Sequence, residues 1–211
     1  VEAAVATVLD RHGRIDGLVN NAGGQFPSTL EHISPRGFDA VIRNNLVGTF
    51  HMMREVFNAW MGEHGGAMVN ITAEHRNGFP GMAHTGAARA GVANLTMTAA
   101  IEWARANVRV NEVAPGLIAS SGLDTYDEPM RSLIRSFPST IPAQRLANEA
   151  EVSGAVCFLL SPAAAFTTGA SLRIDGGSIG AHREWPHAPH DPIPEFDGFH
   201  RRQRPTLFDE G

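Results

Sequence analysis

Apolar residues along this chain fall into two patterns, short continuous runs and longer stretches that repeat every three or four positions. A short apolar run predicts a strand covered on both faces, and a step of three or four predicts one face of a helix. The runs predict strands at residues 15–19, 67–72, 108–113 and 171–175. The periodic stretches predict helices at residues 1–12, 35–63, 85–106 and 148–160.

Capping signals mark the starts of two of these helices. Ser34 precedes Pro35, which places a cap residue before a proline at the first helical position. Asn148 and Glu151 have the spacing of a capping box. Because the predicted strands alternate with the predicted helices, the fold class is α/β, with a parallel sheet and right-handed crossovers.

The composition changes near residue 180. Residues 1–180 carry the alternating elements and predict one domain, whereas residues 181–211 contain five of the 13 prolines and no long apolar run. This segment is predicted to be an irregular Pro/His-rich tail that wraps around the body of the protein or a partner subunit. Its histidines, His182, His187 and His190, lack helical spacing, so no metal site is expected.

Charge and composition exclude several classes of protein. A formal net charge of −5 argues against a nucleic-acid partner, and no apolar run has the length of a membrane span. Cys157 is the only cysteine and is expected in the core. The chain shows no secretory leader, so a reducing, cytoplasmic setting is expected.

The carboxyl end of the first predicted strand offers the clearest candidate site. Asn20 and Asn21 present side-chain amides, and the small residues Ala22, Gly23 and Gly24 allow another molecule to approach the backbone closely. In open α/β sheets, ligands bind at the carboxyl ends of the strands. A glycine-rich G-x-G-x-x-G turn, which would hold a dinucleotide pyrophosphate, does not occur in the sequence.

Four motifs occur in an order and spacing that resemble the short-chain dehydrogenase/reductases, a nicotinamide-dependent family. They are Asn20-Asn21-Ala22-Gly23, Asn45-Leu46-Val47-Gly48, Asn70-Ile71-Thr72 and Pro115-Gly116. The resemblance implies a Rossmann-like, doubly wound parallel sheet. In that family the first motif follows the fourth strand, so the chain is expected to lack its first βαβ units, roughly 60–80 residues.

Two longer segments narrow the resemblance. Asn20–Pro27 and Gly78–Gly91 are similar to peroxisomal-type trans-2-enoyl-CoA reductases and to bacterial citronellol/citronellal dehydrogenase-like proteins, and also to 2,4-dienoyl-CoA reductases. This similarity implies NADPH-dependent reduction of a trans-2-enoyl-CoA, an acyl-CoA thioester. NAD-dependent oxidation of a hydrophobic or terpenoid alcohol such as citronellol is the alternative. A non-catalytic subunit is a third.

The resemblance also implies the catalytic residues. Asn45 corresponds to an asparagine at a helix kink that holds a water or a carbonyl, rather than a polar residue on a solvated helix face. Thr72 corresponds to a serine that hydrogen-bonds the substrate carbonyl, although a strand-end threonine can also satisfy local backbone. Thr85 and Arg89 stand where most members have Tyr-x-x-x-Lys. His75, otherwise an exposed loop residue, is the candidate proton donor because histidine titrates near neutral pH.

Cofactor contacts and assembly follow from the same resemblance. Asn21, Ala22 and Gly23 are expected on the adenosine side of NADP (or NAD), and Arg89 near its ribose hydroxyls. The segment that starts at Pro115 and Gly116 is expected beside the nicotinamide, with the Ile118 backbone at its amide and Ser120 near the phosphates. The two long helices imply a homo-oligomer, a dimer or a tetramer.

Overall fold

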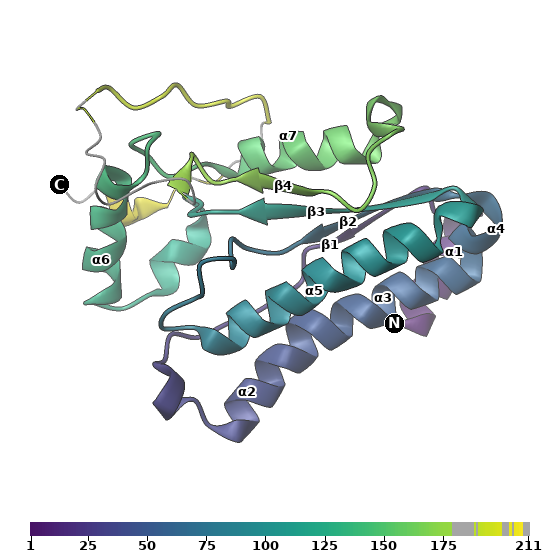
Figure 1. The fold of residues 1–211 in the computed structure, drawn as a ribbon, viewed down its shortest axis with the longest axis horizontal. Coiled ribbons are helices and arrows are strands. Elements are labelled where there is room, and N and C mark those ends of the chain that lie inside the picture. The colour runs from purple at the N-terminus through teal and green to yellow at the C-terminus, as the bar shows by residue number, and fades with distance from the viewer. Residues whose placement is uncertain (179–187, 189, 200–202, 204, 209–211) are drawn as a thin grey trace. The chain divides into compact units, whose positions relative to one another are not determined.

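The computed structural model contains a four-stranded sheet with the strand order β1-β2-β3-β4 (Figure 1). The structure describes residues 1–178, 188, 190–199, 203 and 205–208. The strands are β1 (Gly17–Asn20), β2 (Gly66–Ile71), β3 (Val108–Pro115) and β4 (Ser171–Ile174). The first three pair in parallel, so the predicted α/β fold with a parallel sheet is confirmed.

The helices occur where the apolar periodicity predicts them, with one addition. They are α1 (Glu2–His12), α2 (Pro35–Ile42), α3 (Gly48–Val56), α4 (Gly62–His64), α5 (Ala83–Glu102), α6 (Met130–Ser136) and α7 (Glu149–Leu160). The predicted helix 35–63 consists of α2, α3 and α4 joined by π-helical turns at Arg43–Val47 and Phe57–Met61. The short helix α6 is not predicted by the sequence pattern. None of the described helices is long and apolar enough to cross a membrane.

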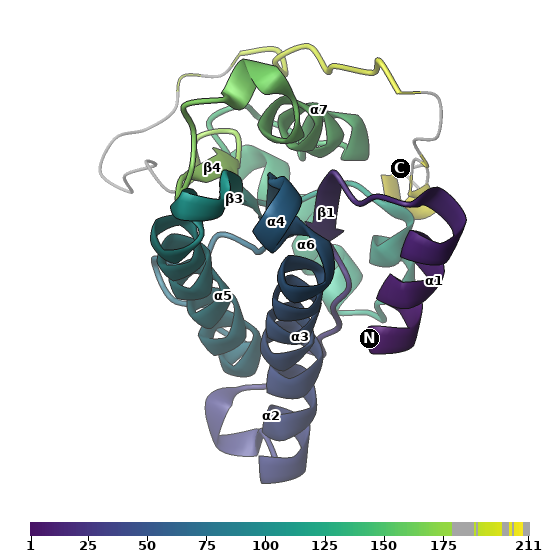
Figure 2. The same cartoon turned by 90° about the vertical axis from the view of Figure 1, so that its right-hand side faces the viewer.

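The chain divides into two compact units, each described by itself. The first unit comprises residues 1–114 and 156–172. Within it α3 and α5 run side by side (Figure 2), and their inward residues pack with the sheet. The buried set is Val5, Ile15, Leu18, Met53, Val56, Met61, Met68, Ala99, Ala100, Val108 and Val110.

A buried chain of amide and hydroxyl groups crosses this core. Asn20 donates to Asn70 Oδ1 at 2.8 Å, and Asn70 donates to Thr96 Oγ1 at 2.9 Å. Thr96 in turn donates to the main-chain oxygen of Val92. These bonds tie the ends of β1 and β2 to α5, so the first asparagine of the Asn-Asn-Ala-Gly motif is satisfied inside the protein.

The last turn of α7 belongs to the first unit. Leu160 lies against Gly17, where an added Cβ would stand 3.4 Å from a leucine methyl group, and Arg109 donates to the main-chain oxygen of Leu159. The expectation that Cys157 lies in the core is wrong, because the residue is exposed. Every residue from Gly154 to Leu160 is apolar, so the pattern does not indicate which face of this end of the helix is buried, and Leu159 is buried instead.

The second unit comprises residues 115–155 and 173–211. Its core contains Ile134, Ile141, Ala143, Leu146 and Leu207. Leu207 belongs to the predicted irregular tail, yet it lies on a 3-10 turn (Thr206–Phe208) and is completely buried. Asp124 accepts the main-chain N–H groups of Thr206 and Leu207, and these bonds lower the pKa of its carboxyl group.

Candidate functional site

Asn45 lies at the centre of the π-helical turn between α2 and α3 and is buried. A π-helical turn displaces the regular hydrogen-bond pattern of the helix and is common at functional sites. Here the Asn45 amide donates to the main-chain oxygen of Val41 at 2.8 Å. Its second N–H donates to the main-chain oxygen of Gly24, also at 2.8 Å. The predicted helix irregularity at Asn45 is therefore present.

The loop that follows β1 is held by the same side chain. Asn45 Oδ1 accepts the N–H of Gly24 at 3.3 Å. One side-chain amide therefore binds both the main-chain N–H and the main-chain oxygen of this glycine. Gly23 is packed between two side chains, because a Cβ built on it would lie 2.5 Å from Asn45 Oδ1 and 2.5 Å from Arg89 Nη2. Asn21 and Ala22 are exposed beside it.

Arg89 projects from α5 toward the ends of β1 and β2. Its Nη1 donates to the main-chain oxygen of Ile71 at 2.9 Å, and its buried Nε has no hydrogen-bond partner. Burial lowers the pKa of the guanidinium, which nevertheless remains a cation at neutral pH. In the described part of the chain, no carboxylate forms an ion pair with it. A half-buried cation with an unused donor, beside a glycine loop, is suited to hold hydroxyl or anionic oxygens of a ligand.

Thr72 follows β2 and points its hydroxyl into the protein. Its Oγ1 donates to Glu112 Oε1 at 2.6 Å, with the main-chain oxygen of Val113 at 3.3 Å. Both residues of the Thr72–Glu112 pair are buried. A threonine hydroxyl has a single proton, and here that proton is directed to an internal acceptor. Toward any ligand Thr72 therefore presents acceptor lone pairs.

His75 lies half-buried in the loop after β2. Its Nδ1 contacts the main-chain oxygen of Ala73 at 2.9 Å, which requires a proton on Nδ1. In the neutral ring Nε2 is then an acceptor, and only the imidazolium can donate a proton from Nε2. The geometry is compatible with the predicted acid role if the ring is protonated before the reaction.

Thr85 lies in the first turn of α5 and is buried together with His84. The Thr85 main-chain N–H donates to His84 Nδ1 at 2.8 Å, and the hydroxyl lies 3.2 Å from the same nitrogen. Phe26 packs its ring edge-on against His84 at a centroid distance of 4.4 Å. The Thr85 hydroxyl is thus engaged by its neighbour.

The remaining predicted cofactor residues belong to the second unit. Pro115 ends β3, and Gly116 donates its N–H to the main-chain oxygen of Ile174 at 2.9 Å. A Cβ on Gly116 would lie 2.9 Å from Asp175 Cα, so close strand packing by itself requires glycine here. Ile118 forms an isolated parallel β-bridge with Ala147, and Ser120 precedes a 3-10 turn.

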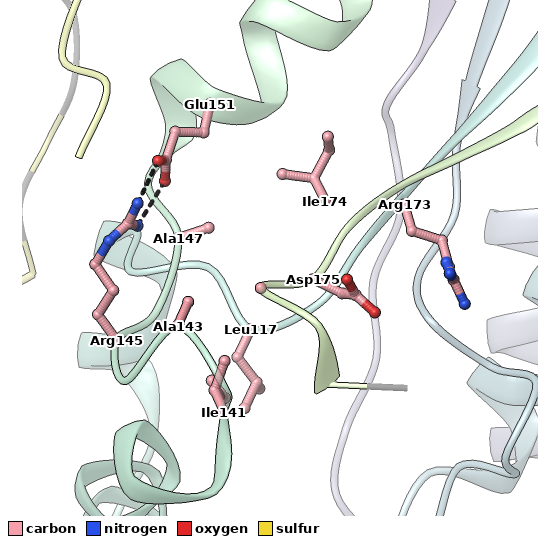
Figure 3. Close-up of a pocket in the computed structure, with 10 residues that line it drawn as sticks. Leu117, Ile141, Ala143, Arg145, Ala147, Glu151, Arg173, Ile174 and Asp175 are labelled. Carbon is pink, nitrogen blue, oxygen red and sulfur yellow. Dashed lines mark hydrogen bonds and ion pairs between the residues drawn. The ribbon is translucent and has the colours of Figure 1, made fainter. Parts of the chain in front are cut away.

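A cavity of about 240 Å³ opens in the second unit, and none of its lining residues is a predicted site residue (Figure 3). Arg145 and Glu151 form a bidentate ion pair on one side of it, with N–O distances of 2.8 and 2.6 Å. Burial alone would raise the pKa of Glu151, but hydrogen bonds from Arg145, Asn148 and Phe196 outweigh it and hold the pKa below its ordinary value. The other lining residues are Leu117, Ile141, Ala143, Ala147, Arg173, Ile174, Asp175 and Gly176.

Gly23, Asn45 and Arg89 are therefore brought into direct proximity at the carboxyl ends of β1 and β2. The hydroxyls of Thr72 and Thr85 are each held by a neighbouring side chain. His182 and His187 lie outside the described residues. Among the described residues, no group of three or more His, Cys, Asp or Glu side chains could hold a metal ion.

Comparison with known proteins identifies a matching family and several similar proteins. A family model described as enoyl-(acyl carrier protein) reductase matches residues 1–178. The peroxisomal 2,4-dienoyl-CoA reductase of Pongo abelii is 39% identical over 180 residues, which cover 84% of this chain and 61% of that protein. The chain therefore spans about three fifths of the length of this curated relative.

Two solved structures resemble the fold closely. The citronellol catabolism dehydrogenase of Pseudomonas aeruginosa PAO1 is 48% identical with a TM-score of 0.73, covering 84% of this chain and 67% of that chain. A gluconate 5-dehydrogenase from Burkholderia cenocepacia J2315, in complex with NADP and tartrate, is 31% identical with a TM-score of 0.77. That match covers 86% of this chain and 71% of the other.

Proposed function

The chain belongs to the short-chain dehydrogenase/reductase family, and from this premise we propose that it serves in NADPH-dependent reduction of a trans-2-enoyl-CoA to the acyl-CoA. The observation that carries the proposal is the pair Thr85 and Arg89, which stand where most family members have the tyrosine and lysine of Tyr-x-x-x-Lys. The alcohol/ketone couple needs a proton-transfer group with a pKa near the working pH, and a threonine hydroxyl is not one. Reduction of a conjugated thioester does not need a proton donor at Thr85, because its proton goes to the α carbon and another residue can supply it. The dienoyl-CoA reductases among the relatives support the same substrate class.

The cluster of Gly23, Asn45 and Arg89 supports a nicotinamide cofactor. The space beside Gly23 excludes a side chain, and Arg89 keeps a buried N–H without a partner. In this proposal Asn21, Ala22 and Gly23 contact the adenosine side and Arg89 binds ribose hydroxyls. In the second unit, Pro115, Gly116, Ile118 and Ser120 serve the nicotinamide and phosphate side. When bound, the cofactor supplies the hydride.

The polar residues divide into two roles. Asn45 holds the loop of Gly23 and Gly24 and is a positioning residue, because both of its N–H groups are used inside the protein. Thr72 and Thr85 are also positioning residues, because their hydroxyls contact Glu112 and His84 inside the protein. His75 is proposed as the proton donor to the substrate α carbon, from Nε2 of its protonated ring.

The direct test is NADPH oxidation with medium-chain trans-2-enoyl-CoA, measured on the purified protein. The proposal predicts turnover that falls at least tenfold in His75→Ala, because general acid catalysis contributes on the order of a hundredfold or more. The absence of NADPH oxidation with 2-enoyl-CoA of every chain length, in a protein that binds NADPH, would refute it.

A second candidate is NAD-dependent oxidation of a terpenoid or other hydrophobic alcohol. It is favoured by the 48% identity to the citronellol catabolism dehydrogenase. Citronellol-dependent NADH formation that is retained in His75→Ala would support this second function. A non-catalytic subunit is the third candidate, favoured by the absence of Tyr-x-x-x-Lys from the sequence. Co-purification with an intact paralogue, without turnover by the chain alone, would select that one.

We also propose a homo-oligomer in a reducing, cytoplasmic setting. Large apolar side chains are exposed on the two neighbouring helices α3 and α5, with Phe50 43%, Met97 49% and Ile101 80% exposed. Exposed apolar residues on adjacent helices favour contact with another subunit. Light scattering on the purified protein distinguishes a dimer or tetramer from a monomer. The single cysteine agrees with a reducing compartment.

A further inference from the structure

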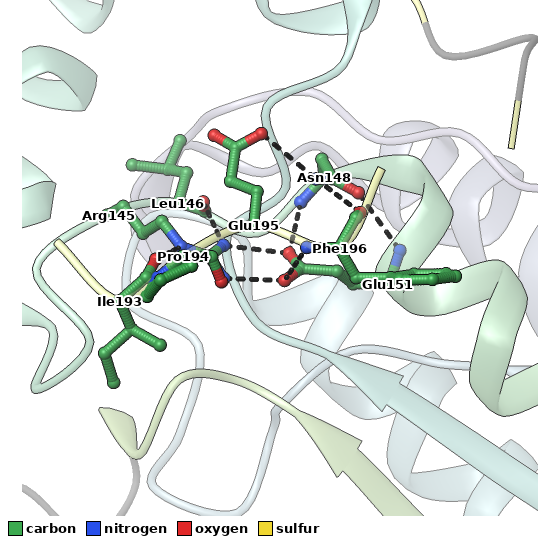
Figure 4. A network of polar contacts seen from close by, with 8 residues as sticks. All are labelled: Arg145, Leu146, Asn148, Glu151, Ile193, Pro194, Glu195 and Phe196. Carbon is green, nitrogen blue, oxygen red and sulfur yellow. Dashed lines mark hydrogen bonds and ion pairs between the residues drawn. The ribbon is translucent and has the colours of Figure 1, made fainter. Parts of the chain in front are cut away.

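Three side chains of the second unit form what we call the carbonyl clamp, namely Arg145, Asn148 and Glu151 (Figure 4). Every N–H of the Arg145 guanidinium has an acceptor. Two N–H groups donate to Glu151, and one donates to the main-chain oxygen of Leu146 at 3.1 Å. The remaining two donate to tail carbonyls, those of Ile193 at 2.5 Å and Pro194 at 3.1 Å.

Asn148 serves two structures at once. Its Oδ1 accepts the N–H of Glu151, and Glu151 Oε2 accepts the N–H of Asn148, which is the reciprocal capping box predicted for the start of α7. This leaves the Asn148 amide nitrogen, which donates to Glu195 Oε2 at 3.2 Å and to the main-chain oxygen of Phe196 at 3.1 Å. Asn148 is 1% exposed, so the tail satisfies a donor that would otherwise lie buried without a partner.

Most contacts of the tail involve its main chain, although His190 Nε2 lies 2.9 Å from the main-chain oxygen of Pro142 and the Glu195 carboxylate accepts from Asn148. Three of its carbonyls, at Ile193, Pro194 and Phe196, accept from the clamp, and the Ile193 N–H donates to the main-chain oxygen of Ala143 at 3.3 Å. The side chains of Ile193 and Phe196 are 51% and 52% exposed, so burial of these side chains does not explain the docking. Pro192 and Pro194 have no N–H to lose and restrict the backbone before it binds.

The charges of the clamp are matched before the tail arrives. Arg145 and Glu151 neutralise each other, and the hydrogen bonds that Arg145 donates to Glu151 raise the pKa of Arg145. The clamp then offers the tail the N–H donors of Arg145 and Asn148 and one acceptor, Glu151 Oε1, which takes the N–H of Phe196 at 3.4 Å. In the structure these donors contact the main-chain oxygens of Ile193, Pro194 and Phe196, and Asn148 also donates to the Glu195 carboxylate.

We propose that the carbonyl clamp is a binding site for an extended, proline-containing peptide main chain, occupied here by residues 190–196 of the same chain. The capping box of α7 builds the site, and the tail fills it reversibly. The other face of the same Arg145–Glu151 pair lines the cavity of the second unit, so docking of the tail also fixes one wall of that cavity.

Hydrogen exchange on the full chain tests the docking. In the wild type, the Ile193 amide exchanges more slowly than in an unstructured peptide. Asn148→Ser keeps a capping oxygen for the Glu151 N–H but removes both donors to the tail. Loss of two hydrogen bonds of ordinary strength accelerates exchange at Ile193 about tenfold or more, whereas amides inside α7 are unchanged.

Substitutions in the tail provide a second test, which leaves the capping box of α7 intact. Pro192→Ala with Pro194→Ala retains both carbonyls but loosens the free tail, which accelerates exchange at Ile193 by about twofold to fivefold per proline. An unprotected Ile193 amide in the wild type would overturn the proposal. Unchanged exchange at Ile193 in Asn148→Ser, with α7 intact, would overturn it as well.

Binding in trans tests the recognition directly. The probe is a fluorescent synthetic peptide with the sequence of residues 188–199. It binds the proline variant more tightly than the wild type, because the wild-type tail competes at a high effective concentration. Adding Asn148→Ser to the proline variant abolishes the gain. Equal binding with and without Asn148→Ser would show that the clamp does not recognise the peptide.

Discussion

Substitution of Gly23 by alanine tests whether Asn45 and Arg89 close tightly around the loop after β1. The φ of Gly23 is not positive, so alanine introduces no backbone strain. The new Cβ would stand 2.5 Å from Asn45 Oδ1, about 1 Å closer than an ordinary contact. Asn45 is 1% exposed and cannot retreat, so the exposed loop moves instead.

Movement of the loop breaks the two hydrogen bonds between Gly24 and Asn45. At about 1 kcal/mol each, their loss lowers the free energy of unfolding by about 2 kcal/mol. For a chain of this length, that corresponds to a decrease in Tm of about 4–8 °C. Thermal unfolding followed by circular dichroism measures the change, and a titration with NADPH measures the accompanying loss of affinity.

The matched control is Gly24→Ala in the same loop. Its Cβ would lie 3.1 Å from Asn44 Nδ2, the end of an exposed side chain that can turn away. The expected decrease in stability is below about 0.5 kcal/mol, as for ordinary surface substitutions. If Gly23→Ala were as stable as Gly24→Ala, the tight packing of Asn45 and Arg89 around Gly23 would be refuted.

Three further predictions concern buried groups. Leu207→Ala lowers the free energy of unfolding by about 2–5 kcal/mol, because the tail residue fills a core, whereas Leu133→Ala at a half-exposed position changes it little; urea denaturation compares the two. Thr72→Val costs about 1–3 kcal/mol, because buried Glu112 loses its donor, and Thr72→Ser restores most of it; retained stability in Thr72→Val would contradict the hydrogen bond. Glu151 has a lowered pKa in the folded protein, so its contribution is complete above the ordinary carboxyl pKa near 4.5 and is lost as the pH falls through the lowered value. The Tm difference between wild type and Glu151→Gln is therefore largest near neutral pH and disappears on acidification, and a pH-independent difference would contradict this linkage.

The sequence was sufficient for the elements whose signals are local. The continuous apolar runs of β2 and β3, the Ser34-Pro35 helix start and the Asn148–Glu151 capping box all occur as predicted. The irregular turn at Asn45 was expected only from the resemblance, in which the corresponding asparagine lies at a helix kink.

Other features depend on contacts between distant residues. Glu112 becomes the partner of Thr72 only because β2 and β3 pair in a register that places Glu112 opposite Asn70. The partners of Arg145 include carbonyls almost fifty residues away, and no local pattern identifies them. Cys157 was misplaced because residues 154–160 are all apolar and do not indicate the orientation of this end of α7.

Titration of the 211-residue chain with NADPH, with NADH for comparison, tests the central claim that the loop around Gly23 and the Arg89 guanidinium hold a nicotinamide cofactor. We expect saturable binding, with a Kd on the order of micromolar, that weakens about tenfold or more in Arg89→Met, since hydrogen bonds from a charged donor contribute about 1.5–3 kcal/mol. The absence of binding by a folded wild-type chain, or equal affinity in Arg89→Met, would contradict it.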